Sequence, residues 1–348
     1  MGSSDVRRGR VSAMAVIGWA ALAMLVVGTF LAALGGLNAT IYGSSSFVER
    51  YLEAIADDDI AAAASTPGVA LDDAELEAFG LPADISTAML RSGVVSAGPE
   101  DITIVSDVAN PDGSHSVTAS YRLGDEIAES TFLVRPLEPL YGVLHRWEFA
   151  DSPIAVIDVT AAHNPLFTVG DLTLDTRANK TGDELTAFSH TAPYLAIAPA
   201  AYTFEYDSVL LEAAHVSVVA GAAEQVPVTV DAQPTPAFVE RVQLKVDEYL
   251  TACAEQPVLQ PAGCPFGIEI DDRVTAEPQW SILTSPQVTL TAGESSFDMP
   301  PTEGVAHISV EAQDLFDGHF YTVEQDRPFT LALAATINPD GSIAIQLK

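Results

Sequence analysis

Val11–Leu37 reads VSAMAVIGWAALAMLVVGTFLAALGGL, a run of 27 residues without a charged side chain. An α-helix needs about 20 apolar residues to cross the hydrocarbon core of a bilayer. At about 1.5 Å of rise per residue the run reaches roughly 40 Å, which spans that core with some tilt. A helix also satisfies its own backbone hydrogen bonds, which lipid cannot do. The run therefore predicts a transmembrane helix over residues 11–37, with the lipid bilayer as its partner.

The charges around this run predict its orientation. Arg7, Arg8 and Arg10 precede it, and no basic residue follows until Arg50. Because positive residues are retained on the cytoplasmic side, we expect a cytoplasmic tail over 1–10 and an outer part from about residue 38 onward. The alternative is a cleaved signal peptide, but the apolar core of such a peptide is usually about 7–15 residues long. The sequence favours an uncleaved signal-anchor and a single-pass protein of the cell membrane.

The composition limits the partners of the outer part. Asp and Glu number 48 against 15 Lys and Arg, and the formal net charge is −33. Such a field repels nucleic acid, so we expect no nucleic-acid partner. It attracts cations, basic peptides or amine-bearing cell-wall components, although an acidic surface also serves solubility alone. Hydrophobic residues make up 48% of the chain, which is enough for packed cores and excludes a disordered outer part.

The two cysteines, Cys253 and Cys264, both fall in the predicted outer part. An oxidising compartment and their short spacing favour one disulfide bond. In the chain-entropy model such a loop contributes about 3 kcal/mol. The alternatives are a redox pair, which normally has Cys-x-x-Cys spacing, and a metal site, which needs more ligands. We interpret the pair as structural.

Residues 44–150 predict helices followed by a sheet. Ser46 begins a capping box, and apolar residues then recur at helical spacing up to Ile55. Asp57-Asp58-Asp59 can cap a second short helix. Alternating strands follow, with a hairpin turn at Asn110-Pro111-Asp112-Gly113 and a last strand, YGVLHRWEF, over residues 141–149. That strand places Tyr141, His145 and Trp147 on one face.

The phrase FVERYLEAIADDDIAAAAS, followed by this meander of about four strands, resembles the ketosteroid-isomerase-like, cystatin-like cone superfamily. The resemblance implies a curved sheet folded over a helix, with an apolar pocket between them. Tyr121, His145 and Trp147 are the candidate pocket residues. A histidine in such a pocket can act as a base, or it can be a satisfied core residue. Family enzymes use an acidic base with a tyrosine or acid as oxyanion donor, but no such role can be assigned to a position here.

Residues 151–235 consist of short β-rich runs separated by turn residues, which predicts a small β-sandwich. The phrase AIAPAAYTFEY, residues 196–206, is similar to prealbumin-like or carboxypeptidase-regulatory-like sandwiches. That similarity implies a domain that presents, spaces or binds. His163, His190 and His215 are scattered singly through the segment, without the spacing of a metal site.

Residues 236–348 predict a disulfide-stapled helix and antiparallel sheet. Thr235 and Pro236 suit the cap and first turn of a helix whose apolar stripe we expect at Phe238, Val242, Leu244 or Lys245, and Tyr249. The chain then alternates through 304–313 and closes with a hairpin, residues 329–347, around Asn338-Pro339-Asp340-Gly341. This module is similar to domains that recur in actinobacterial envelope proteins. The scarce lysines and abundant alanines of the chain also resemble the composition of proteins from such bacteria.

The motifs of common enzyme classes do not occur in the sequence. It contains no Gly-x-Ser-x-Gly, no Ser-x-x-Lys, no His-Glu-x-x-His and no phosphate-binding glycine loop. Carboxylate pairs for glycoside hydrolysis stay open, because such pairs come from distant positions. We therefore expect an α+β multidomain protein with no catalytic, cofactor or metal residues. Its outer part binds or scaffolds envelope proteins or cell-wall components. The alternatives are a small-ligand carrier or an enzyme that uses the cone pocket, and a cation-binding envelope protein.

Overall fold

The computed structural model describes residues 13–178 and 188–348, which form a mixed α+β fold with several β-sheets. The chain divides into two compact units. Unit 1 comprises Met1–Ile157, Pro193–Tyr202 and Val218–Val226, and unit 2 comprises Asp158–Ala192, Thr203–Ser217 and Pro227–Lys348. The borders between the units fall inside the segment that we expect to form a sandwich. The domain ranges 44–150, 151–235 and 236–348 therefore stay a prediction.

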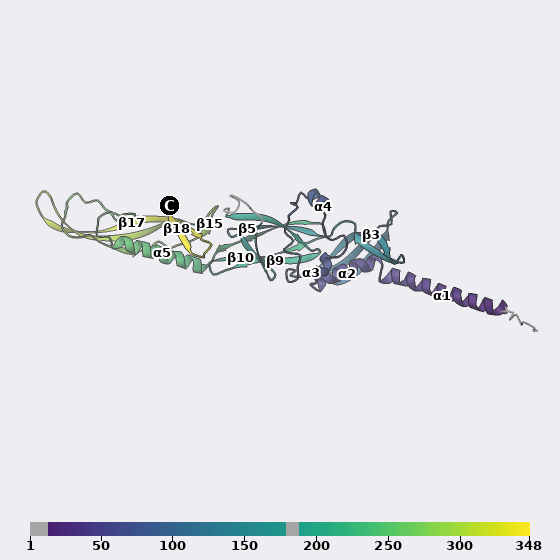
Figure 1. The fold of residues 1–348 in the computed structure, drawn as a ribbon. Coiled ribbons are helices and arrows are strands. Elements are labelled where there is room, and N and C mark those ends of the chain that lie inside the picture. Colours follow the sequence, from purple (N-terminus) through teal and green to yellow (C-terminus); the bar gives the residue numbers. More distant parts are fainter. Residues whose placement is uncertain (1–12, 179–187) are drawn as a thin grey trace, which may run out of the picture. The chain divides into compact units, whose positions relative to one another are not determined.

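The apolar run forms one long helix, α1 (Ala13–Thr40), coloured purple in Figure 1. Its portion Ile17–Thr40 is long and apolar enough to cross a membrane, and its most hydrophobic window is not buried inside the protein. The prediction of a helix that can span a bilayer is confirmed. Arg7, Arg8 and Arg10, and with them the predicted cytoplasmic tail, lie outside the described residues.

Three shorter helices follow in unit 1. They are α2 (Ser44–Ala56), α3 (Ile60–Ala64) and α4 (Asp73–Ala78). The predicted capping box at Ser46 is wrong, because α2 begins directly after Gly43 and no side chain caps it. Ser46 instead donates a hydrogen bond to the carbonyl of Thr40. The predicted cap of the second helix is confirmed, since the Asp59 side chain accepts a hydrogen bond from the N–H of Ala62.

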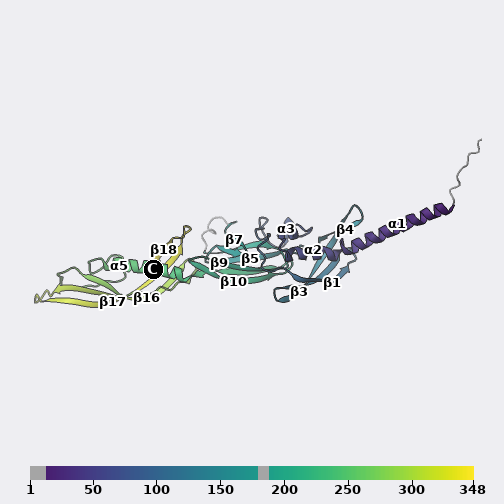
Figure 2. The same cartoon turned by 90° about the horizontal axis from the view of Figure 1, so that it is seen from below.

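Four consecutive antiparallel strands form the sheet of unit 1, in the order β1-β2-β3-β4. The strands are β1 (Glu100–Ala109), β2 (His115–Leu123), β3 (Glu126–Leu140) and β4 (Leu144–Phe149). The helix α2 packs against β1 and β2, and it lies beside this sheet in Figure 1 and Figure 2. The turn Asn110–Gly113 joins β1 to β2 as predicted. In such a meander the β1–β2 and β3–β4 turns lie at one end of the sheet, and the β2–β3 turn lies at the other.

The last strand of this sheet is shorter than the sequence predicts. It begins at Leu144 because Tyr141 and Gly142, with φ of 54° and 74°, form a turn instead of extending the strand. Trp147 and Phe149 are buried on one face as expected. Tyr141 lies in the turn and not on the strand, so its predicted place on this face is wrong, whereas His145 is exposed but lies beside Trp147 as expected.

The middle of the chain contributes two sheets, ordered β12-β10-β9-β6-β7 and β11-β5-β8. Their strands are β5 (Ala155–Ala162), β6 (Leu166–Val169), β7 (Leu172–Asp175), β8 (Ser189–Ala196), β9 (Ala200–Asp207), β10 (Leu211–Ala220), β11 (Gln225–Asp231) and β12 (Gln233–Pro234). The prediction that this segment is rich in short β-strands is therefore confirmed.

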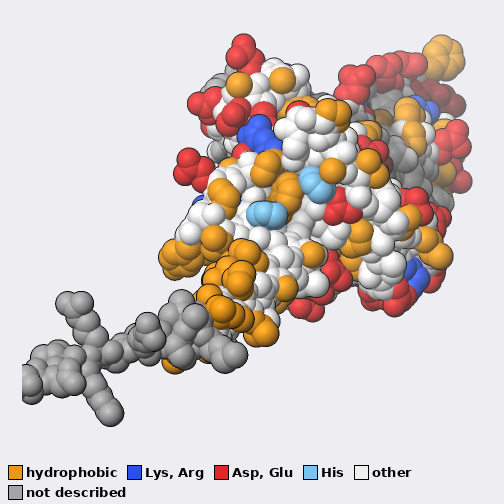
Figure 3. Space-filling model, turned by 90° about the vertical axis from the view of Figure 1, so that its right-hand side faces the viewer, with side chains coloured by type: hydrophobic (Ala, Val, Ile, Leu, Met, Phe, Trp, Pro, Cys, Tyr) orange, Lys and Arg blue, Asp and Glu red, His pale blue; other side chains and the backbone are white. Residues whose placement is uncertain are grey.

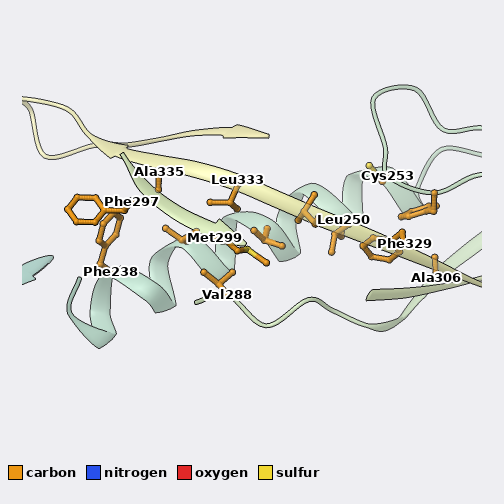
Figure 4. Packing of buried hydrophobic residues seen from close by; sticks show 14 of the residues in the cluster. Phe238, Leu250, Cys253, Val288, Phe297, Met299, Ala306, Phe329, Leu333 and Ala335 are labelled. Atoms are coloured by element: carbon orange, nitrogen blue, oxygen red, sulfur yellow. The ribbon is translucent and has the colours of Figure 1, made fainter. Parts of the chain in front are cut away.

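Unit 2 is built around α5 (Pro236–Ala254), which Thr235 caps as predicted by accepting a hydrogen bond from the N–H of Phe238. Its buried stripe is only partly the predicted one. Leu244 is 57% exposed, and the stripe continues from Val242 through Val246, Leu250 and Cys253. Figure 4 shows Phe238 of α5 beside Phe297 at one end of this core and Leu250 close to Phe329 toward the other.

The strands that face α5 form one antiparallel sheet. They are β13 (Arg273–Val274), β14 (Gln279–Thr284), β15 (Thr291–Ala292), β16 (Phe297–Gln313), β17 (Phe320–Ile337) and β18 (Ile343–Leu347). The predicted closing hairpin is confirmed, with Leu333 opposite Leu347. The disulfide bond between Cys253 and Cys264 is also confirmed, and it ties the end of α5 to the following loop.

Candidate ligand groove beside the membrane helix

An open groove of about 720 Å³ lies in unit 1, where α1 ends and β4 begins. Its walls come from the end of α1, the start of α2, and strands β1 to β4. The lining residues are Asn38, Ala39, Gly43, Ser44, Ser45, Asp107, His115, Pro136, Leu137, Glu138, Pro139, His145, Arg146 and Trp147. Figure 3, which looks at the molecule from the side of α1, shows two histidine side chains near each other. The groove volume falls within the range of about 300–1,000 Å³ that is typical of small-molecule sites.

A compact polar cluster forms one wall of the groove. The Ser44 hydroxyl donates to Asp107 Oδ2 at 2.5 Å, and the Ser45 hydroxyl donates to the same oxygen at 2.7 Å. His115 Nδ1 lies 2.5 Å from Asp107 Oδ1. Ser44 itself is buried, because it begins α2 directly against the sheet. Asp107 is thus held from two elements, the start of α2 and the neighbouring strand β2.

These hydrogen bonds lower the pKa of Asp107. Burial acts to raise it, but the bonds from Ser44, His115 and Ser45, together with the charge of His115, outweigh burial. Each of these donors stabilises the ionised carboxylate over the neutral acid. The groove wall therefore carries a negative charge, and both carboxylate oxygens of Asp107 already have hydrogen-bond partners.

The cluster contains serine, histidine and aspartate, but its geometry does not suit nucleophilic catalysis. In a relay the histidine contacts the serine through one ring nitrogen and the aspartate through the other. Here Ser44 Oγ lies 3.2 Å from His115 Nδ1, the same nitrogen that contacts Asp107. The serine proton points to the carboxylate and not to the imidazole. This arrangement can position and bind, but it does not activate Ser44.

Trp147 forms the apolar part of the groove and joins it to the end of the membrane helix. Its indole N–H donates to the carbonyl of Tyr42 at 2.9 Å. Its ring packs edge-to-face with His115, at a centroid distance of 4.8 Å, and with His145 at 6.3 Å. His145 and Arg146 also line the groove next to this ring.

The structure brings together two of the three pocket residues predicted from the sequence. His145 and Trp147 line the groove, but Tyr121 does not. Tyr121 is 3% exposed, and its hydroxyl shares a 2.6 Å hydrogen bond with Ser130 Oγ. Burial raises the pKa of Tyr121, and that hydrogen bond counteracts the rise only partly.

Aromatic side chains fill the space between α2 and the sheet. Tyr51 and Phe149 have ring centroids 4.9 Å apart, and Phe132 lies 6.2 Å from Tyr51 and 5.7 Å from Phe149. The Tyr51 hydroxyl, fully buried, donates to the carbonyl of Ala198 at 2.5 Å. The groove with His145 and Trp147 therefore lies outside this packed layer.

Ser44, Asp107 and His115 were not candidates at the sequence level. Asp107 stands 63 positions from Ser44 along the chain, and His115 stands 71 positions from it. No short motif carries such a spacing. One signal was available. The Asn110–Gly113 turn sets the register of β1 on β2, and that register places Asp107 and His115 near the turn.

Single histidines elsewhere pair with carboxylates. His163 Nδ1 lies 2.6 Å from Asp231 Oδ1, and His307 contacts both Asp326 and Glu324 at 2.7 Å. Within residues 13–178 and 188–348, no group of three or more His, Cys, Asp or Glu side chains is placed to hold a metal ion.

Comparison of the chain with models of protein families, with curated proteins and with solved structures finds no significant match.

Proposed function

We propose that the protein is a single-pass envelope protein of the cell membrane whose outer part binds a partner without catalysis, through the groove beside α1. In this proposal α1 stays in the lipid, with its N-terminus in the cytoplasm. The outer part consists of a cone-type domain, a β-sandwich and a disulfide-stapled α+β domain. The resemblance of residues 44–150 to the cystatin-like cone and that of residues 151–235 to prealbumin-like sandwiches belong to the same proposal. The bond between Cys253 and Cys264 supports an oxidising outer compartment.

One observation carries the proposal: α1 passes into the first domain without a loose linker. The Asn38 side chain donates to the Val143 carbonyl at 2.8 Å and accepts from the His145 N–H at 3.1 Å. Arg50 binds the carbonyl of Ile41 at 2.8 Å, and Trp147 binds that of Tyr42. The end of the helix is therefore fastened to β4 and α2. A domain held in this way presents its groove at a constant height above the bilayer.

The chemistry of the groove favours binding over reaction. Asp107 is engaged by Ser44, Ser45 and His115, and the serine is not activated. The groove also offers an aromatic ring and an exposed Arg146 and His145, which suit a partner with an anionic or aromatic group.

Site-specific photo-cross-linking in cells tests the proposal. A photoreactive residue replaces Glu138, an exposed groove residue near the end of β3, in the full chain. The matched control replaces Glu126, an exposed acid at the start of the same strand. The two positions are separated by roughly 40 Å of extended chain. We expect a discrete adduct from position 138 and none from position 126. Equal labelling at both positions, or none at either, contradicts the proposal.

The size of the groove also favours a second candidate, a carrier for a small ligand. The same experiment separates the two functions by mass. A shift of less than about 1 kDa, the upper range of ligands that fit such pockets, indicates a carrier, whereas a protein-sized shift indicates an assembly partner.

A further inference from the structure

We propose that the β3–β4 turn, Leu140-Tyr141-Gly142-Val143, inserts into the interfacial layer of the bilayer beside α1 and forms a second membrane contact. We call these four residues the interfacial turn. The inference rests on the part of the proposed function that keeps α1 in the lipid. It is independent of what the groove binds.

The first support is the composition of the interfacial turn. Tyr141 is 87% exposed, Val143 45% and Leu140 40%. Two other hairpin turns of the described chain, Asn110–Gly113 and Asn338–Gly341, have the polar sequence Asn-Pro-Asp-Gly. The interfacial turn instead leaves three large apolar side chains in contact with solvent. The β16–β17 turn is also apolar, with Leu315 70% and Phe316 101% exposed, so the interfacial turn is distinguished by its place next to the end of α1.

The second support is the backbone of the turn. Tyr141 and Gly142 both have positive φ, and the Val143 N–H donates to the Leu140 carbonyl at 3.2 Å. Two-residue turns of this type favour Asn-Gly or Asp-Gly, because side chains other than these resist positive φ. The left-handed region is unfavourable for tyrosine, because its Cβ comes too close to the following carbonyl oxygen. Its exposed ring recovers none of that cost by burial within unit 1, whereas burial in lipid offsets it.

The third support is that β4 runs beside the segment that follows α1, in the same direction. Phe149 packs on Phe47 with ring centroids 5.0 Å apart, Trp147 bonds to Tyr42, and Val143 bonds to Asn38. Earlier residues in and just before β4 therefore contact earlier residues of this segment, up to the end of α1. The apolar run of α1 ends at Leu37, one residue before Asn38. Tyr141 lies two residues before Val143 in the chain, within about 7 Å of it, and so reaches the level where the apolar run of α1 ends.

The chemistry of the turn matches the interface and not a charged surface. Tyrosine is enriched where hydrocarbon meets headgroups, since its ring is apolar and its hydroxyl stays hydrated. The net charge of −33 opposes electrostatic attachment to anionic lipid. The contact is therefore apolar, and we expect it to persist at high salt and in purely zwitterionic vesicles.

Fluorescence quenching in vesicles tests the inference with the full chain. Both native cysteines are bonded to each other, so a new cysteine can be labelled selectively. Tyr141→Cys and Val143→Cys carry an environment-sensitive dye in the turn. Ile127→Cys is the control, because Ile127 is 79% exposed and lies at the opposite end of β3. Leu25→Cys reports whether α1 itself is inserted. Each protein is reconstituted in phosphatidylcholine vesicles without nitroxide lipid, with a lipid that carries a nitroxide near its headgroup, or with a lipid that carries a nitroxide in its acyl chain.

We expect nitroxide lipid to lower the emission at positions 141 and 143 about twofold, as for groups at headgroup depth, and to leave position 127 unchanged. A dye at position 25 that is quenched by acyl-chain nitroxides, together with unquenched dyes at 141 and 143, overturns the inference but leaves the anchor intact. If position 25 is not quenched either, α1 is not in the bilayer and the proposed function fails as well. Quenching at 141 that disappears in high salt also contradicts an apolar contact.

Discussion

Replacing Gly68 by alanine tests the close backbone contact that holds β4 in the core of unit 1. Gly68 has φ of +80°, and a Cβ built there would lie 2.3 Å from the carbonyl oxygen of Phe149 and 2.6 Å from its nitrogen. The neighbouring Pro67 carbonyl accepts the Phe149 N–H at 3.0 Å. Phe149 is 2% exposed and packs on Tyr51, so it has little room to move.

Three costs determine the expected magnitude. Positive φ costs an alanine about 1 kcal/mol or more. Displacing Phe149 breaks its hydrogen bond to Pro67, at about 1 kcal/mol. Repacking a full core costs about 1–3 kcal/mol. We therefore expect Gly68→Ala to lower the free energy of unfolding of unit 1 by at least about 3 kcal/mol, which corresponds to roughly 150-fold in the opening equilibrium.

Gly80→Ala is the matched control. Gly80 also has positive φ, at +68°, but a Cβ there would meet no atom within 4 Å. The free energy of unfolding should therefore fall only by the conformational cost of positive φ, about 1 kcal/mol. Hydrogen–deuterium exchange of peptides from residues 47–55, in the full chain in lipid nanodiscs, measures the opening free energy of α2. If Gly68→Ala accelerates that exchange no more than Gly80→Ala does, the steric argument is wrong.

Three further outcomes are expected. Tyr51→Phe should destabilise unit 1 by about 1–3 kcal/mol, because the buried Ala198 carbonyl loses its donor; thermal unfolding of the matched proteins measures this, and an unchanged midpoint would contradict it. Replacing Cys253 and Cys264 together by serine should cost unit 2 about 3 kcal/mol, visible as faster exchange in α5 with unit 1 unaffected. The lowered pKa of Asp107 contributes stability that is present above its unfolded value and is lost as pH falls through the folded value. When the pH falls below about 4, the Asp107→Asn variant should therefore lose less stability in unit 1 than the native protein does; acid titration of the two proteins measures this.

Features that depend on neighbouring residues could be predicted from the sequence. The span of α1 follows from a long uncharged run, and the cap of α5 follows from Thr235 before Pro236. The Asn-Pro-Asp-Gly turns identify two hairpins, and the faces of β16 follow from strict alternation, with Ala306 and Ile308 buried as expected. Each of these signals acts over a few residues, within the range of backbone sterics and side-chain period.

Local signals also misplaced some details. The box at Ser46 has the right residue types for a cap, but the N-cap of α2 is Gly43, three residues earlier, and Ser46 bonds to the Thr40 carbonyl at the end of α1. The run Tyr141 to Phe149 alternates like one strand, yet the positive φ of Tyr141 turns its start into a hairpin tip. In the first case a contact with the end of α1 overrides a local preference, and in the second the backbone turns although the side chains alternate.

The sequence alone determined that the chain carries a bilayer-length apolar helix, an acidic folded part and one disulfide, because hydropathy, charge and cysteine content need no coordinates. Only the tertiary structure decided which side chains meet in the groove. Ser44, Asp107 and His115 converge because the start of α2 lies against a sheet whose register places positions 107 and 115 together. Such convergence depends on long-range packing of a helix on strands, and no periodicity within one segment encodes it.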